Sequence, residues 1–370
     1  MRLRNNRLLV LLALSSFLVL APRASSRQDS PANHAGRSTP SQASPAQDPP
    51  SSPSPSPSTQ EATPPAQGET HPDKEQGPAE DDSVFVFKKK VEEVAVHATV
   101  VDEQGHMVLD LAKGAFSVYE NGQLQTLTSF RHEDIPVAMG IVIDNSGSMR
   151  EKRDKVNKAA VNLVRSSNPQ DQVFVVNFND EYYLDQPFTS SIKKLSDALD
   201  KVEARGGTAL YDALVASADY MKQQARLQKK VIFVVTDGED TASQETLEAA
   251  VRRLEEENGP TVYAIGILGE EKSRRAKRAL ETIARSTGGL AFLPRSLDEV
   301  DEISRDIAHD IRNQYTLGYK PTTPKSAGGY RTIRVEARAK GHKKLTVRTR
   351  NGYYPGQEQS PSESRAPGSN

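Results

Sequence analysis

Three oxygen-bearing side chains stand at alternate positions in one short segment: Asp144, Ser146 and Ser148. They follow Val137–Ile143, an apolar run without helical period, which predicts a strand buried on both faces. A helical pattern begins soon after, with apolar residues at i, i+3, i+4, i+7 and i+8 from Val156. We therefore expect the three side chains in a loop at the carboxyl end of a central strand, where open α/β sheets bind their ligands.

Two further loops offer the same kind of chemistry. Gly206-Gly207-Thr208 presents a hydroxyl after two glycines, which allow a tight backbone turn. Thr236-Asp237-Gly238 ends a second apolar strand, predicted over 230–236. In a doubly wound sheet the ends of separate strands meet at the switch point, so these loops can converge on the loop of Asp144. Hydroxyls with few carboxylates suit a hard divalent cation, and they favour Mg²⁺ over Ca²⁺.

Strand and helix patterns alternate between residues 137 and 313. Further strands are predicted at 173–178, 182–188, 262–267 and 290–292, and helices at 192–202, 209–228, 247–254, 276–286 and 297–311. Thr241 and Gln244 have the spacing of a capping box for the helix around 247–254. This alternation predicts an α/β fold with a doubly wound, mainly parallel, Rossmann-like sheet that has helices on both faces.

Residues 84–136 and 314–356 show strand patterns instead. In the first segment, Asn121-Gly122 predicts a two-residue turn between strands at 116–119 and 124–130, after an alternating strand from Val94 to Val100. In the second, strands are predicted at 315–319, 330–337 and 345–350. Each segment is too short to bury a core alone. We expect them to pair into one small, split β-sandwich-like domain into which the α/β domain, residues 137–313, is inserted.

The two ends of the chain differ from the rest in composition. Residues 1–26 begin with three arginines at positions 2, 4 and 7, followed by a short apolar run and small residues, a pattern typical of a secretory signal peptide, with an uncleaved membrane anchor as the alternative. Residues 27–83 are rich in Pro and Ser, and residues 357–370 are polar, so a disordered linker and a disordered tail are expected. We expect an exported protein, periplasmic or secreted, that is tethered to a membrane only if the anchor stays.

The composition excludes several classes of function. Lys and Arg number 48 against 49 Asp and Glu, so no net field attracts nucleic acid or an anionic membrane. The absence of cysteine excludes disulfides, thiolate metal sites and a catalytic thiol, and the seven histidines lack zinc-ligand spacing. The basic cluster at 272–278 has no interleaved aromatic residues, and we interpret it as the solvated face of a helix.

The three loops, in this order on a strand–helix alternation, resemble the metal-ion-dependent adhesion site of von Willebrand factor A domains over residues 137–313. The resemblance implies that Ser146, Ser148 and Thr208 bind the metal through their hydroxyls. It also implies that Asp144 and Asp237 act largely through bound water. The metal would be Mg²⁺, with Mn²⁺ or Ca²⁺ as alternatives, and one coordination position would stay open for a Glu or Asp carboxylate of a partner protein.

The wider layout resembles the bacterial, acidobacterial-type von Willebrand A-related exported proteins. In them a front β segment like V-A-V-H-A-T-V-V-D and F-S-V-Y-E-N-G-Q precedes the domain, and a segment like Y-T-L-G-Y follows it. The resemblance implies no particular partner.

Other uses of the Asp144 loop fit the residues less well. An EF-hand needs Gly at its sixth position and Glu at its twelfth, where this chain has Met149 and Lys155. A haloacid-dehalogenase-like phosphotransferase needs a second Asp where Ser146 stands, and serine cannot do general acid–base work at neutral pH. Each hydroxyl taken singly could be a helix cap. The convergence of three loops favours a metal site.

We therefore expect a non-enzymatic, metal-dependent adhesion or scaffold module. Tyr182, Tyr183 and Tyr211 are candidate contact residues at the rim of the metal face, with a half-buried core position as the alternative. Asp212 and Asp240 are expected to be solvated or to lie behind the ligands. The competing hypothesis is a structural or assembly protein of the cell envelope, in which the metal only holds the loops together and the β domain makes the contacts.

Overall fold

The computed structural model describes residues 93–201, 203–268 and 273–356. The expected signal peptide, linker and C-terminal tail lie outside the described residues. None of the helices in the described ranges is long and apolar enough to cross a membrane.

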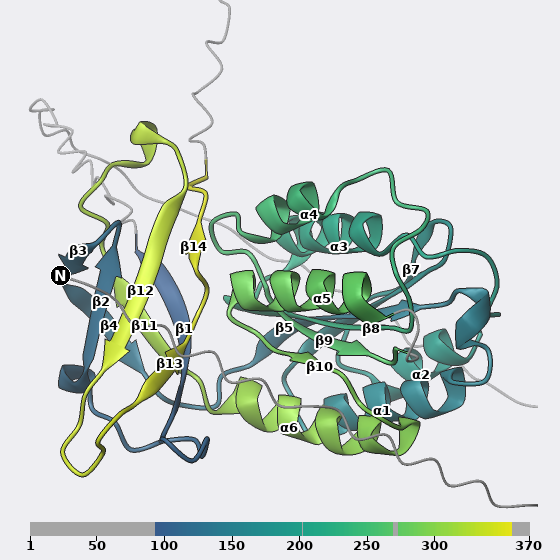
Figure 1. The fold of residues 1–370 in the computed structure, drawn as a ribbon, viewed down its shortest axis with the longest axis horizontal. Coiled ribbons are helices and arrows are strands. Elements are labelled where there is room, and N and C mark those ends of the chain that lie inside the picture. Colours follow the sequence, from purple (N-terminus) through teal and green to yellow (C-terminus); the bar gives the residue numbers. More distant parts are fainter. Residues whose placement is uncertain (1–92, 202, 269–272, 357–370) are drawn as a thin grey trace, which may run out of the picture. The chain divides into compact units, whose positions relative to one another are not determined.

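A six-stranded sheet in the order β10-β9-β8-β5-β6-β7 forms the centre of the α/β domain (Figure 1). Its strands are β5 (Val137–Asp144), β6 (Gln172–Phe178), β7 (Tyr182–Thr189), β8 (Lys229–Thr236), β9 (Thr261–Gly266) and β10 (Ala291–Phe292). The neighbours pair in parallel except for β7, which runs antiparallel to β6. Every residue of β5 is buried, because helices cover both faces of the sheet. The predicted α/β fold with a mainly parallel sheet is confirmed.

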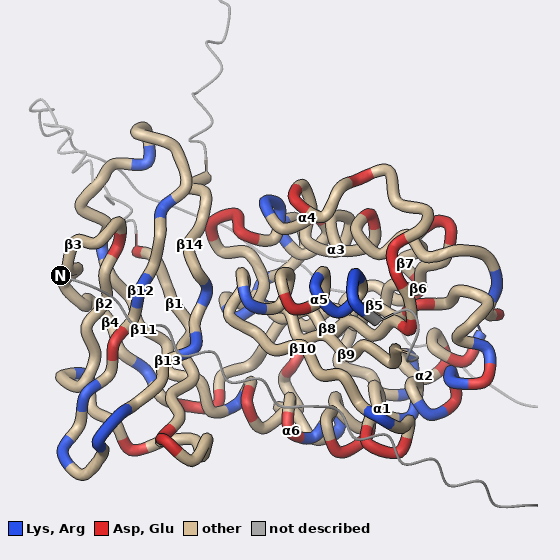
Figure 2. The backbone as a smooth tube through the Cα atoms, viewed as in Figure 1, with Lys and Arg blue, Asp and Glu red and all other residues tan. Residues whose placement is uncertain are grey.

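Six α-helices of the described part of the chain pack on this sheet, and each face of the sheet has its own apolar core. They are α1 (Arg153–Arg165), α2 (Ile192–Asp200), α3 (Leu210–Gln224), α4 (Leu247–Leu254), α5 (Ser273–Thr287) and α6 (Val300–Arg312). Helices α1, α2 and α6 cover one face, and α3, α4 and α5 cover the other (Figure 1). Charged residues lie mainly on the helices and loops, whereas the strands at the centre are almost free of them (Figure 2).

The bounds of several helices differ from the sequence prediction by a few residues, most of all at the end of α3 and the start of α4. Helix α3 ends at Gln224, before the predicted residue 228. Helix α4 is capped by Thr246, whose side chain accepts a hydrogen bond from the Ala249 amide, so the predicted capping box at Thr241 is wrong. The segment from Thr241 to Thr246 is a loop.

The strands before and after the α/β domain form two four-stranded sheets around one core. The first sheet has the order β13-β1-β11-β4 and the second β14-β12-β2-β3. Their strands are β1 (Val94–Val101), β2 (Phe116–Glu120), β3 (Gln123–Gln125), β4 (Leu127–Arg131), β11 (Tyr315–Tyr319), β12 (Arg331–Ala337), β13 (Thr346–Arg348) and β14 (Gly352–Tyr353). Strand β1 pairs antiparallel with β11, and β2 with β12, so the two ends of the described chain share this β unit.

The predicted hairpin after β2 forms, but its second strand is shorter than expected. Asn121 and Gly122 both have positive φ, 49° and 80°, as a two-residue turn of this kind requires. Of the predicted second strand of the hairpin, only the part that forms β3 pairs with β2. The expected single strand at 124–130 is wrong, because the chain leaves this sheet after Gln125 and β4 pairs with β11 in the other sheet.

Candidate metal centre

Asp144 is the last residue of β5 and is fully buried. Its Oδ1 accepts a hydrogen bond from the Ser146 amide at 2.7 Å, and its Oδ2 accepts one from the Thr236 hydroxyl at 2.6 Å. Thr236 ends β8, the parallel neighbour of β5, so the two strand ends lie side by side. The carboxylate is therefore fixed at the carboxyl edge of the sheet by two neighbouring elements.

The surroundings of Asp144 disfavour its ionised form. Burial raises the pKa of this carboxyl, and the hydrogen bonds from Thr236 and Ser146 lower it only in part. Among the described residues Asp144 has no ion-pair partner. A buried carboxylate without a cation is costly, so a bound cation would stabilise this arrangement.

The serines of the loop connect Asp144 to Asp237. The hydroxyls of Ser146 and Ser148 lie 3.2 Å apart, and the Ser148 hydroxyl donates to Asp237 Oδ1 at 2.7 Å. Ser146 and Asp237 are buried, whereas Ser148 is exposed. The cluster is therefore closed toward the sheet and open to solvent on the side of Ser148.

Backbone hydrogen bonds hold the loop of Thr208 at the same edge of the sheet. The Gly147 amide donates to the Gly206 carbonyl at 3.1 Å, and the Thr241 amide donates to the Thr208 carbonyl at 2.9 Å. The Thr208 side chain points toward the third loop, since its Oγ1 lies 4.0 Å from the place that a Cβ on Gly238 would take. Within the described ranges the Thr208 hydroxyl has no hydrogen-bond partner, so it is available to a ligand.

None of the three hydroxyls serves as a helix cap. Ser146 precedes the 3₁₀ turn of Gly147–Met149, but its side chain makes no cap hydrogen bond. Helix α1 has its N-cap at Lys152, and α3 has its N-cap at Ala209. The capping alternative therefore does not explain these side chains.

The double glycine is required by a close approach of Asp180. Asp180 Oδ1 accepts a hydrogen bond from the Gly207 amide at 2.7 Å. Gly206 has φ +76°, and a Cβ there would lie 2.1 Å from Asp180 Oδ2. A side chain at position 206 would displace the loop that carries Thr208.

Two other aspartates have structural roles that the sequence did not predict. Asp240 Oδ2 accepts a hydrogen bond from the Tyr211 amide at 3.0 Å. Asp212 accepts hydrogen bonds from the amides of Gln244 and Glu245 at 2.9 and 2.8 Å. Together they hold the 241–246 loop against the start of α3, and with it the third loop of the site.

Sequence reasoning also missed Thr236 as a partner of Asp144 and Lys152 as an ion-pair partner of Asp237. Thr236 could have been found from its place at the end of β8, beside the end of β5. Lys152 carried no such signal, because its contact with Asp237 joins positions 85 residues apart.

The donor set fits a hard cation of the Mg²⁺ type. The five predicted residues offer only oxygen, from two carboxylates and three hydroxyls. Across the described residues no group of three or more His, Cys, Asp or Glu side chains is arranged to hold a metal. A metal centre of this composition would thus depend on hydroxyls, which sets it apart from a carboxylate cage.

Residues 139–239 match the sequence profile of a family described as von Willebrand factor type A domain. The α/β unit is a von Willebrand factor type A domain. The matched stretch begins in β5 and ends just after β8, so it includes all three loops of the candidate centre. Domains of this family generally mediate protein–protein interactions and are typically non-enzymatic. No curated protein matches the chain.

Solved structures similar to the chain include several bacterial proteins. A von Willebrand factor type A protein from Catenulispora acidiphila is 17% identical, with 73% of this chain and 75% of that chain covered and a TM-score of 0.44. The domain of the type V pili tip protein Mfa5 from Porphyromonas gingivalis is 13% identical, with 48% and 97% covered and a TM-score of 0.39. A mutant of the minor pilin PilB from Streptococcus sanguinis is 15% identical, with 48% of this chain covered and a TM-score of 0.42; the match spans 62% of the pilin chain, less than two thirds of its length.

Proposed function

We propose that the A domain is a metal-dependent protein-binding module of the adhesion or scaffold type. The residues that would hold Mg²⁺, with Mn²⁺ or Ca²⁺ as alternatives, are Asp144, Ser146, Ser148, Thr208 and Asp237. The observation that supports this most is that the Ser146 and Ser148 hydroxyls, which cap no helix, lie with Asp237 beside a buried Asp144 that has no ion-pair partner among the described residues, while the Thr208 side chain points toward the loop of Asp237.

The residues of the site divide into two kinds. Ser146, Ser148 and Thr208 are neutral oxygen donors, whereas Asp144 and Asp237 are already engaged by hydrogen bonds and would act largely through water. When bound, Mg²⁺ would supply a Lewis-acidic position for an exogenous Glu or Asp carboxylate. The exposed Ser148 lies on the side from which such a carboxylate would approach.

An apolar patch beside the site is suited to contact a partner. Tyr182, Tyr183 and Leu184 at the start of β7 are 51%, 44% and 43% exposed. Strand β7 is an edge of the sheet, and Tyr182 pairs with Phe178, whose carbonyl accepts a hydrogen bond from the Asn145 amide at 2.6 Å. This patch therefore lies next to the loop of Asp144. Exposed aromatic residues of this kind are enriched at protein interfaces, which supports Tyr182 and Tyr183 as rim contacts.

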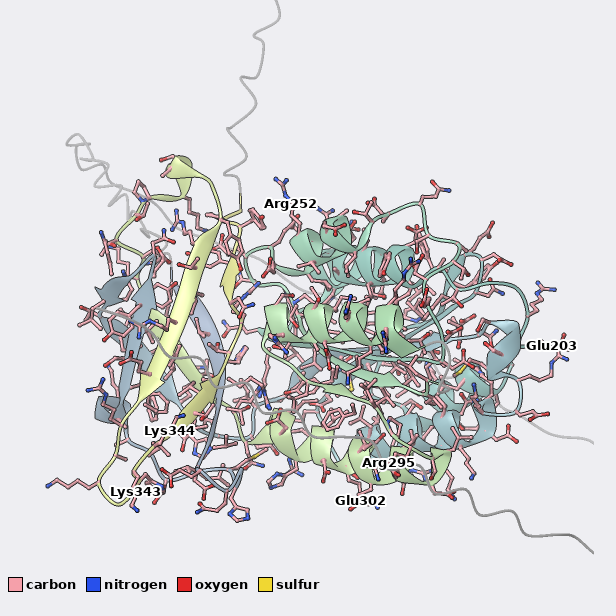
Figure 3. All side chains as sticks on the ribbon, in the orientation of Figure 1. Glu203, Arg252, Arg295, Glu302, Lys343 and Lys344 are labelled. Carbon is pink, nitrogen blue, oxygen red and sulfur yellow. The ribbon has the colours of Figure 1, made fainter. Side chains whose placement is uncertain are left out.

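The rim near Thr208 is polar in contrast. Tyr211 is half-buried, and its amide is held by Asp240. The side chain of Glu203 points away from the domain (Figure 3), while its carbonyl accepts a hydrogen bond from Asn145 Nδ2 at 2.8 Å. A partner would thus meet an apolar edge on one side of the site and a polar loop on the other.

We place the protein outside the cytoplasm, in the periplasm or secreted, with a membrane tether only if the N-terminal segment is not cleaved. The signal-peptide pattern of residues 1–26, the Pro- and Ser-rich linker and the absence of cysteine support this.

The test is calorimetric titration of the full chain, freed of metal by chelation, with Mg²⁺ and then Mn²⁺. Wild type is compared with Asp144→Ala and with the control Asp197→Ala, which removes an exposed carboxylate that pairs with Lys193 on α2. We expect saturable binding for wild type and control, and none for Asp144→Ala with its fold intact by circular dichroism. Equal binding by Asp144→Ala would overturn the proposal.

The same variant separates this function from the structural alternative once a partner is in hand. Lost partner binding by folded Asp144→Ala is the result expected of an adhesion site. Lost stability, with partner binding retained by the folded fraction, would favour an envelope assembly protein in which the metal only holds the loops together.

A further inference from the structure

The candidate metal centre contains a positive charge of its own. The ammonium of Lys152 forms an ion pair with Asp237 Oδ2. The Asp237 side chain is 1% exposed and that of Lys152 is 28% exposed, so the pair is largely shielded from solvent. The other oxygen, Asp237 Oδ1, accepts the hydrogen bond from Ser148. Both oxygens of Asp237 are therefore engaged by groups of the chain itself.

Lys152 is held in place by the turn that carries the serine ligands. The Met149 amide donates to the Ser146 carbonyl at 3.0 Å, and the Lys152 amide donates to the Met149 carbonyl at 2.9 Å. Lys152 is also the N-cap residue of α1, and its carbonyl accepts from the Val156 amide at 3.1 Å. Its ammonium is thus anchored at a defined place beside the site.

The pair changes the charge that a cation would meet. Asp144 and Asp237 contribute two negative charges, and Lys152 offsets one of them. The nearby Arg153 forms no ion pair with Asp144, because its guanidinium donates to Asn177 Oδ1 at 3.0 Å and to the Leu199 carbonyl at 2.8 Å, but its positive charge still acts on Asp144 through space. Counting only Asp144, Asp237 and Lys152, a bound divalent cation leaves a net charge of +1, and Arg153 adds to the positive charge nearby. Without Lys152 the surroundings of the metal would be less positive by one charge.

We propose that Lys152 is a resident counter-ion of Asp237 that weakens binding of a divalent cation alone and makes cation binding depend on an acidic ligand. The excess positive charge left after the metal binds attracts one more anion, and the carboxylate of a partner supplies it. Cation and partner then bind together more tightly than the cation binds by itself. This inference rests on the proposed function, since it assigns a role to Lys152 at the same site.

The test compares Mg²⁺ and Mn²⁺ titrations of the full chain in wild type, Lys152→Met and Lys155→Met. Lys155 is the matched control, because it stands three residues away but pairs with the exposed Asp298. We expect Lys152→Met to bind Mg²⁺ about tenfold more tightly than wild type, since a like charge next to the ion is removed. Lys155→Met should equal wild type.

A second measurement uses sodium acetate as the carboxylate probe. Acetate should increase the Mg²⁺ affinity of wild type more than that of Lys152→Met, because wild type keeps one more positive charge beside the metal after binding it. If Lys152→Met does not fold without metal, Lys152→Gln replaces it, as it retains a hydrogen-bond donor for Asp237. The expected direction is the same.

The outcomes separate the two proposals. Equal or weaker Mg²⁺ binding by the Lys152 variants, with binding still present, overturns the role of Lys152 and leaves the metal centre standing. The absence of binding by wild type and by every variant overturns both. Binding by Lys152→Met where wild type binds too weakly to measure supports the role of Lys152.

Discussion

Glu120 in the β unit and Asp144 in the A domain are both buried carboxylates, but their surroundings differ. Glu120 Oε2 accepts hydrogen bonds from the hydroxyls of Tyr319 and Tyr353 at 2.6 and 2.9 Å, and its Oε1 faces the Arg331 guanidinium at 3.5 Å. Asp144 receives one amide and one hydroxyl hydrogen bond, without an ion pair among the described residues.

The difference separates a structural carboxylate from the one that we propose to bind a ligand. The charge of Glu120 is balanced inside the core by Arg331, and the side chains of both residues are 1% exposed. The charge of Asp144 has no such partner, and the cluster around it opens to solvent at Ser148. Burial alone therefore does not mark a functional carboxylate. In this chain, burial without an ion-pair partner among the described residues, next to hydroxyls that cap no helix, is what supports the proposed role of Asp144.

The largest effect that this comparison predicts is at Arg331. Arg331→Met leaves Glu120 buried without its cation, so the free energy of unfolding should fall by about 3–5 kcal/mol, measured by urea denaturation. Arg331→Met/Glu120→Gln should recover a large part of this loss, because the unpaired charge is gone. The Mg²⁺ affinity of the folded protein should not change. A loss below about 1 kcal/mol in the single variant would contradict the structural role of the pair.

Thr208→Ala should have the opposite effects on stability and on Mg²⁺ affinity. We expect its Mg²⁺ affinity to fall at least tenfold, roughly the effect of losing one direct oxygen ligand, with little change in the stability of the metal-free protein, because the hydroxyl has no partner in the described ranges. Thr246→Ala is the matched control. It removes the N-cap of α4, so it should cost about 1 kcal/mol of stability without changing Mg²⁺ affinity. Unchanged affinity in Thr208→Ala would remove Thr208 from the site.

The smallest predicted effect is a pH-dependent difference in stability between metal-free wild type and metal-free Asp144→Asn. The pKa of Asp144 is raised in the folded protein by burial, so metal-free wild type loses stability as pH rises from the ordinary aspartate pKa through the raised value. Asn does not titrate. Asp144→Asn should therefore be the more stable of the two at pH 7, and the gap should close in acid. Saturating Mg²⁺ should reverse the order, because only wild type binds it. Thermal unfolding across pH, with and without Mg²⁺, measures both.

The sequence located the three loops because their signals are local. Asp144 directly follows one long apolar run, and Thr236 ends another. The pair Gly206-Gly207 predicts a tight turn before Thr208. The contacts that the sequence did not predict form between segments that come together only in the folded structure. The contact of Lys152 with Asp237 and that of Asp180 with Gly207 join segments that have no shared pattern in the chain.

The errors in the fold have related causes. Thr241 and Thr246 both match a helix N-cap, but Asp212 holds the amides of Gln244 and Glu245, so the helix can begin only after Thr246. The residues from 124 to 130 form one unbroken β pattern, and no residue in it marks the change of sheet between β3 and β4.

Anomalous diffraction from crystals of the protein grown with Mn²⁺ tests most directly whether the three loops hold one divalent cation together. We expect a single strong anomalous peak within about 2.5 Å of the hydroxyl oxygens of Ser146, Ser148 and Thr208, with Asp144 and Asp237 behind it. A map without a peak at this edge of the sheet, from crystals with Mn²⁺ well above the affinity measured in solution, would contradict this expectation. A peak elsewhere on the domain would contradict it as well.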